Sequence, residues 1–177
     1  GCYARMNDYT TTIFEMHDKP GGLCTAWQRK GYTIDGCLHW LVGSAPGTGL
    51  YTLWQELGAL QGQQVINTDR FYRIEGAEGK SFDMYTDIDR LESHMKEIAP
   101  EDARLIGELC RSIRRFTRLD MPVHKAPELY SALEGLKLLV RIFPHLCAMR
   151  KWERITMTDL ARRFKNPLLR DAWEQVW

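Results

Sequence analysis

The stretch Thr10–Gly22, with the sequence TTTIFEMHDKPGG, constrains the fold of this chain more than any other. Thr10–Phe14 is a β-branched run with an aromatic end, which predicts a buried strand. One carboxylate, Glu15, follows it, and a short polar turn then leads to the glycines Gly21 and Gly22. In nucleotide-binding α/β folds, a carboxylate at a strand end accepts hydrogen bonds from both ribose hydroxyls. Adjacent glycines let the backbone approach a pyrophosphate, because no Cβ stands in the way.

Two plainer interpretations remain open for this stretch. Glu15 could be an ordinary residue at a strand end, and the glycine pair could form only a turn. The spacing between the carboxylate and the glycines favours the ribose interpretation. The stretch therefore predicts half of a nucleotide site.

The other half of such a site is absent from the sequence. Cys2–Met6 predicts the end of a helix, with Asn7 as a left-handed residue after it. A helix followed by a turn and a strand is the second half of a βαβ unit, but no GxGxxG turn precedes it. Gly43–Gly49 is glycine-rich but does not follow a strand in the required register. Because the chain begins with Gly1 and ends without a helix cap, we expect both ends to be cut.

The remaining chain predicts a β-hairpin and then helices. Gly31–Gly36 predicts a short strand, and Leu50–Leu57 predicts a helix with Thr48 as its N-cap. The further expected elements are a hairpin of Val65–Ile74 and Ser81–Tyr85, a helix over Ile88–Ile98 capped by Asp87, a helix from Pro100 to about Leu119, and helices from Glu128 onward with breaks near Pro144, Thr156–Asp159 and Asn166–Pro167. We expect an α/β fold class, with a partial nucleotide-binding domain over residues 1–60 and a hairpin-plus-helical region over 61–177.

Composition and charge narrow the classes of protein. Five scattered cysteines without a CxxC pair argue against a disulfide framework and a metal site, and for a reducing, cytoplasmic compartment; they are Cys2, Cys24, Cys37, Cys110 and Cys147. Residues 1–100 carry 9 Lys/Arg against 13 Asp/Glu, whereas residues 101–177 carry 15 against 10. This split is compatible with a basic face for an anionic ligand or membrane surface, and a solvated helical surface is the plainer interpretation. We expect no nucleic-acid partner.

With Glu15 and the glycine pair in place, the chain resembles the FAD-dependent oxidoreductases of the phytoene desaturase, carotenoid isomerase and retinol saturase group. The resemblance rests on TTTIFEMHDKPGG and GYTIDGCLHWL, and more weakly on RFYRIEGAEGKSFDMYTD and TDLARRFKNPLLRDAW. It implies an incomplete Rossmann-like FAD-binding domain with a β-hairpin and a mainly helical substrate or cap region. It also implies an apolar, isoprenoid or polyene-like substrate and a desaturase, saturase or isomerase-like reaction.

The resemblance implies a role for several residues. Glu15 would bind the adenosine ribose of FAD, His17 would contact the adenosine end, and Gly21 and Gly22 would approach the pyrophosphate. Leu23 stands where relatives often have arginine, which removes one charge contact. His39 and Trp40 lie in a stretch that would approach the flavin ring and substrate, although a histidine in an apolar run is more often a core residue. We assign no catalytic residue, because the flavin ring carries this chemistry, and we expect the 177 residues alone to bind FAD weakly and to be inactive.

Two alternatives stay open. The chain could be a non-catalytic helical interaction module that retains a degenerate nucleotide-binding half. The apolar segment Leu133–Met149 could be the core-facing side of a cap helix or a peripheral membrane contact, since Arg150, Lys151 and Arg154 follow it. The segment is interrupted by Lys137, Arg141 and Pro144 and is too short to span a bilayer. The sequence carries no signal for an oligomeric state.

Overall fold

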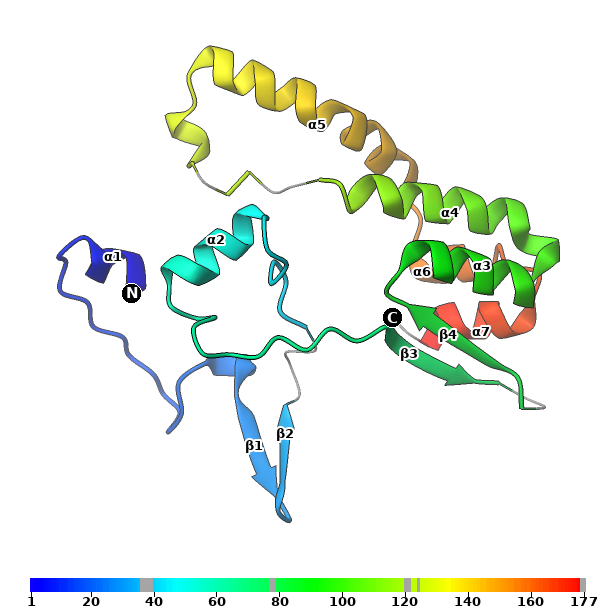
Figure 1. Cartoon of the computed structure of the whole chain (residues 1–177), viewed down its shortest axis with the longest axis horizontal. Helices are drawn as coiled ribbons and strands as arrows, with labels where there is room; N and C mark the ends of the chain where they lie inside the picture. Colours follow the sequence, from blue (N-terminus) through cyan, green and yellow to red (C-terminus); the bar gives the residue numbers. More distant parts are fainter. Residues whose placement is uncertain (36–39, 77–78, 120–121, 124, 176–177) are drawn as a thin grey trace. The chain divides into compact units, whose positions relative to one another are not determined.

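The computed structural model describes residues 1–35, 40–76, 79–119, 122–123 and 125–175. The chain divides into two compact units, one that contains residues 1–65 and one that contains most of residues 66–177. The elements of both are labelled in Figure 1. Helices and small antiparallel sheets occur in both units, so the mixed α and β character expected from the sequence is confirmed.

The N-terminal unit consists of short elements. They are α1 (Cys2–Met6), the 3₁₀ turn η1 (Gly22–Cys24), β1 (Ala26–Arg29), β2 (Tyr32–Asp35) and α2 (Gly49–Glu56). The strands pair antiparallel with Trp27 opposite Ile34. Lys30 and Gly31 both have positive φ, at 49° and 82°, as a tight two-residue hairpin turn requires. Thr48 caps α2 as expected, because its hydroxyl accepts a hydrogen bond from the Tyr51 N–H at 3.2 Å.

The expected strand over Thr10–Phe14 is wrong. These residues form no strand, and their side chains are exposed, with Ile13 80% and Phe14 92% accessible. A strand requires a ladder partner for its backbone groups, and both sheets of the described residues are two-stranded hairpins formed elsewhere. Hence the Rossmann-like detail of the prediction has no support in this structure. Asp8, at φ 63°, takes the left-handed position that we expected for Asn7, whose φ is −106°.

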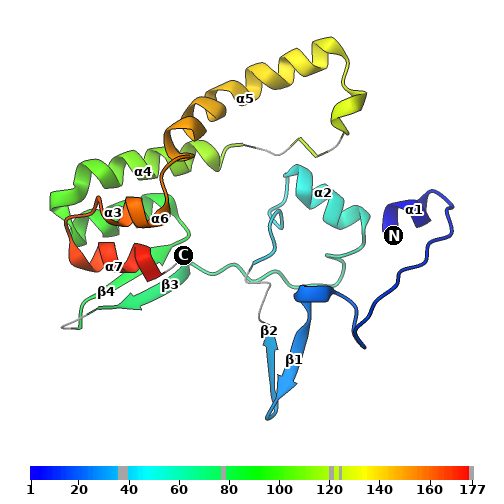
Figure 2. The same cartoon turned by 180° about the vertical axis from the view of Figure 1, so that it is seen from behind.

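The C-terminal unit contains the core. Its elements are β3 (Arg70–Glu75), β4 (Ser81–Tyr85), α3 (Ile88–Ile98), η3 (Pro100–Asp102), α4 (Ala103–Phe116), η4 (Pro127–Leu129), α5 (Ala132–Trp152), α6 (Met157–Ala161) and α7 (Pro167–Gln175). Both α3 and α7 contact β4, α3 packs on α4, and α6 packs on α7, as the opposite views of Figures 1 and 2 show. The hairpin, the helix capped by Asp87 and the helix after Pro100 are confirmed.

The buried apolar side chains lie on β4, α3, α4, α6 and α7 or next to them. They are Phe82, Met84, Leu91, Met95, Ala99, Ile106, Leu109, Cys110, Leu160, Ala161, Phe164, Leu169, Ala172 and Trp173. On α3 and α4 they recur at helical spacing, which gives each helix one apolar face for the core. Burial raises the pKa of the Cys110 thiol to about 11, so this cysteine is a buried apolar residue and not a reactive thiol.

Helix α5 departs from two expectations. It runs unbroken through Pro144, and none of its described apolar side chains is buried. Seven of them are 41–67% exposed, namely Leu133, Leu136, Leu139, Val140, Phe143, Leu146 and Met149. The expectation of a core-facing helix is therefore wrong, because the contacts of α5 with α4 lie near its C-terminal end. No helix in the described part of the chain combines the length and apolarity that a bilayer crossing requires.

A buried carboxylate joins the two strands of the second hairpin. Asp83 is 5% exposed. It accepts two hydrogen bonds from Arg73, at 2.8 and 2.9 Å, and one from Arg70 at 3.0 Å. The Asp83 N–H donates to Nε2 of His94 on α3 at 3.1 Å. The Arg73 guanidinium, helped by Arg70 and opposed by burial, holds the pKa of the Asp83 carboxyl well below its usual range.

This network predicts a loss of stability in acid. Because the folded pKa of Asp83 is depressed, its contribution is complete above the unfolded pKa of about 3.9 and is lost as the pH falls below it. We expect Arg73→Gln to remove roughly 1–3 kcal/mol from the free energy of unfolding at pH 6 and much less near pH 2. Urea unfolding at a series of pH values measures this. The control is Arg5→Gln on the exposed side of α1, and a loss of stability independent of pH would contradict the assignment.

Candidate functional site

The segment that contains Glu15 and His17 is an exposed turn held by local hydrogen bonds. Glu15 Oε1 accepts from the His17 N–H at 2.9 Å. His17 Nδ1 lies 3.2 Å from the Lys19 N–H and 2.8 Å from Asp18 Oδ1. One nitrogen cannot serve both partners in the same state: unprotonated, it accepts from Lys19, and protonated, it donates to Asp18. Among the residues that the structure describes, none donates to the second oxygen of Glu15, which leaves it to an outside donor.

The glycine pair adopts a conformation that other residues resist. Gly21 has φ 118° and Gly22 has φ 56°, both in the left-handed region. A Cβ on Gly21 would lie 3.3 Å from Thr25 Cγ2, whereas a Cβ on Gly22 would meet nothing within 4 Å. The space beside Gly22 is therefore open. Leu23 follows with 88% of its surface exposed.

The exposure and the backbone conformation of the expected cofactor residues can be compared with what FAD requires. Glu15, His17, Gly21, Gly22 and Leu23 lie close together in sequence on one exposed stretch. The exposed carboxylate suits ribose hydroxyls, and the open backbone at Gly22 suits a bulky group. Trp40 is 48% exposed. His39 lies outside the residues that the structure describes.

The C-terminal unit holds an apolar pocket that the sequence analysis missed. Its volume is about 770 Å³. It is lined by Phe71, Met84–Ile88, Leu91, Leu109, Ser112, Ile113, Phe116, Thr117, Trp152, Ile155, Met157, Leu160 and Trp173. Ligand pockets span about 300–1,000 Å³ and are mostly apolar with a few polar groups. The helical spacing of Leu109, Ile113 and Phe116 could have indicated this pocket, because these residues continue the apolar face of α4 past the core.

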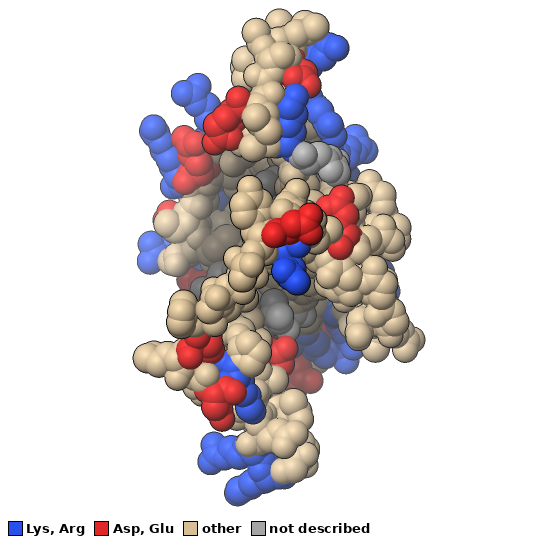
Figure 3. Space-filling view, turned by 90° about the vertical axis from the view of Figure 1, so that its left-hand side faces the viewer, with Lys and Arg blue, Asp and Glu red and all other residues tan. Residues whose placement is uncertain are grey.

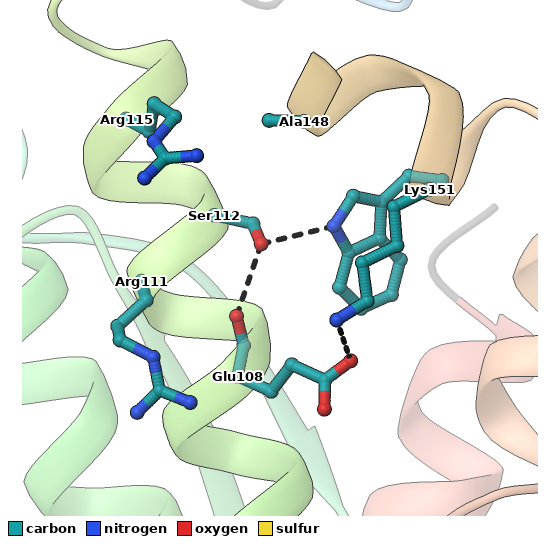
Figure 4. A pocket seen from close by; sticks show the side chains of 7 residues that line it. Glu108, Arg111, Ser112, Arg115, Ala148 and Lys151 are labelled. Carbon is teal, nitrogen blue, oxygen red and sulfur yellow. Dashed lines mark hydrogen bonds and ion pairs between the residues drawn. The ribbon is translucent and has the colours of Figure 1, made fainter. Parts of the chain in front are cut away.

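Trp152 lines the apolar pocket, and a hydrogen bond to a residue of α4 holds its side chain in place. Its indole N–H donates to Ser112 Oγ at 2.9 Å, and Ser112 donates in turn to the Glu108 carbonyl at 3.0 Å. Next to it, Lys151 pairs with Glu108 at 2.5 Å and lowers the pKa of that carboxyl. Figure 4 shows this junction of α4 and α5 from close by. The contacts give the pocket wall a defined position.

The chain is similar to known flavin-dependent proteins. Residues 4–168 match the sequence pattern of the family described as flavin containing amine oxidoreductase. A curated relative, a lycopene-forming phytoene desaturase from Pantoea ananas, is 27% identical over 172 residues, which cover 91% of this chain and 32% of the relative. The chain thus spans about a third of the length of the curated relative that it matches. No solved structure is significantly similar to it.

Proposed function

The chain belongs to the flavin containing amine oxidoreductase family, whose cofactor is FAD, and from this premise we propose that the full-length protein is a desaturase-like oxidoreductase acting on an apolar, isoprenoid or polyene-like substrate. Membership of the family confirms the resemblance and the cofactor inferred from the sequence. The observation that carries the substrate class is the apolar pocket of about 770 Å³ in the C-terminal unit. The name of the phytoene desaturase relative supports the same class.

We propose that the exposed N-terminal turn holds the adenosine end of FAD. Glu15 would accept hydrogen bonds from ribose hydroxyls, His17 would contact the adenosine, and the backbone at Gly21 and Gly22 would lie against the pyrophosphate. Charge-assisted hydrogen bonds of this kind are short and strong. When bound, the flavin ring supplies hydride chemistry. The role of this chain is then to anchor the cofactor and to keep water from an apolar substrate.

We further propose that α5 makes a peripheral contact with a lipid phase. Its exposed leucines, Val140 and Phe143 alternate with basic residues, among them Lys137 and Arg150. A helix with an apolar face and basic residues is typical of interfacial binding. A contact of this kind would suit a substrate dissolved in lipid. The exposed apolar side chains of α5 also support the alternative function, a non-catalytic helical interaction module.

A variant that fills the apolar pocket tests the proposed substrate class. In the full-length protein, Ile113→Trp adds bulk to the pocket wall, and we expect it to lower kcat/KM for phytoene supplied in liposomes on the order of tenfold. Flavin absorbance should be unchanged, because Ile113 is not among the residues that we propose to hold the cofactor. Ile113→Leu, which preserves the volume, is the control.

Three outcomes of this experiment contradict the proposal. Wild-type activity in Ile113→Trp would show that the substrate does not enter this pocket. Equal losses in both variants would indicate a packing defect rather than a blocked pocket. A colourless full-length protein that binds no FAD would overturn the enzyme proposal and favour the interaction module.

A further inference from the structure

A row of arginines lines a surface hollow between α4 and α5. The hollow has a volume of about 440 Å³ and is formed by Arg111, Arg114, Arg115, Arg118, Pro144 and His145. Arg111, Arg114 and Arg115 lie on one face of α4, because residues three and four apart on a helix are neighbours, and Arg118 follows in the turn after it. We call this feature the arginine hollow. It lies outside the apolar pocket, with which it shares no residue.

The positive charge in the arginine hollow is only partly compensated, and Glu108 interacts with Arg111 without forming an ion pair with it. Arg114 is paired, since it contacts both Asp89 and Glu92. In the described chain, no carboxylate forms an ion pair with Arg111, Arg115 or Arg118. Figure 4 shows Arg111 and Arg115 on the same side of α4, each without a partner among the residues drawn. The negative end of the α4 dipole offsets only a small part of this charge, in the last turn of the helix.

His145 brings an unsatisfied polar atom to the same place. Its Nδ1 is shielded from solvent and has no hydrogen-bond partner among the described residues. Because that nitrogen presents no surface to the hollow, it is the arginines that point to an anion with several acceptor oxygens.

We propose that the arginine hollow binds a phosphate group. Guanidinium groups are planar forks that match phosphate oxygens two at a time, and several of them can share a dianion. The volume exceeds that of one phosphate ion and admits a diphosphate or the headgroup of an acidic phospholipid. Both sources present the same chemistry. Figure 3 shows that, on the face it draws, basic and acidic residues are interspersed over a largely uncharged surface.

Binding of pyrophosphate to the purified protein tests the site directly. We expect saturable binding by isothermal titration, weakened about tenfold or more in the double variant Arg115→Gln/Arg118→Gln. The matched control is Arg162→Gln/Arg163→Gln, which removes the same charge from exposed positions after α6. Equal weakening in the control, or no binding to the wild type, would overturn the proposal.

Vesicles distinguish the two sources of phosphate. If the ligand is a headgroup, the wild type binds vesicles of phosphatidylcholine with phosphatidylglycerol, the Arg115/Arg118 variant binds them about tenfold less, and pyrophosphate competes. If the ligand is a soluble phosphate compound, pyrophosphate binds and these vesicles do not. Equal binding to pure phosphatidylcholine in both variants, without any pyrophosphate binding, would overturn the site. Flavin content and turnover are not read in either arm, so the result is independent of the proposed enzyme function.

Discussion

Replacing Glu15 by alanine in the full-length, flavin-loaded protein is expected to weaken FAD binding by one to three orders of magnitude. The carboxylate would lose two charge-assisted hydrogen bonds to ribose hydroxyls, each worth about 1.5–3 kcal/mol before water compensates. Because Glu15 is exposed and already accepts one hydrogen bond from the His17 N–H, we expect the lower part of this range. The dissociation constant from quenching of FAD fluorescence measures the effect.

The chain offers a matched control for this experiment. Asp18 lies three residues away with 80% of its side chain exposed, and Asp18→Ala removes the same charge from the same stretch. We expect this variant to keep most of its FAD affinity. Equal losses in the two variants would indicate a general charge effect, and unchanged affinity in Glu15→Ala would mean that the carboxylate does not contact the ribose.

The features of the fold that the sequence predicts best are those with a local chemical cause. The Asp87 carboxylate accepts a hydrogen bond from the Arg90 N–H at 2.8 Å, and α3 begins directly after this N-cap residue. The Thr156 hydroxyl accepts the Asp159 N–H at 3.1 Å, and α6 begins after it for the same reason. Such signals need only neighbours in sequence, and they also predict the second hairpin from its alternating residues.

The features that failed depend on distant partners. Thr10–Phe14 has the composition of a strand, but composition supplies no ladder partner, and the segment stays exposed. Helix α5 has the composition of a core helix, yet burial needs a facing surface. The apolar pocket joins side chains from Phe71 to Trp173, so no local pattern describes it. Among the expected site residues, Glu15 and the two glycines are neighbours in sequence, so their closeness needs no distant partner.

The largest loss of stability is expected at Asp102, which ties two distant parts of the C-terminal unit together. Asp102 is 4% exposed. Its carboxylate accepts the Lys165 N–H at 2.9 and 3.0 Å and the Asn166 N–H at 2.9 Å, across more than 60 residues of sequence. Asn166 in turn accepts the Leu169 N–H at 3.3 Å at the start of α7, which carries buried Trp173. The carboxylate therefore holds the chain at the point where α7 enters the core.

Asp102→Ala is expected to lower the free energy of unfolding by roughly 2–5 kcal/mol, because it leaves two part-buried N–H groups without an acceptor. This is a large share of the 5–15 kcal/mol that is typical of a folded protein. Asp102→Asn should lose less, since its amide oxygen, placed where Oδ2 lies, can still accept from the Lys165 and Asn166 N–H groups, without the charge of the carboxylate. Urea unfolding followed by circular dichroism measures both, with Asp171→Ala on the exposed side of α7 as the control. A loss at Asp102 no greater than at Asp171 would mean that other contacts hold α7 on the core.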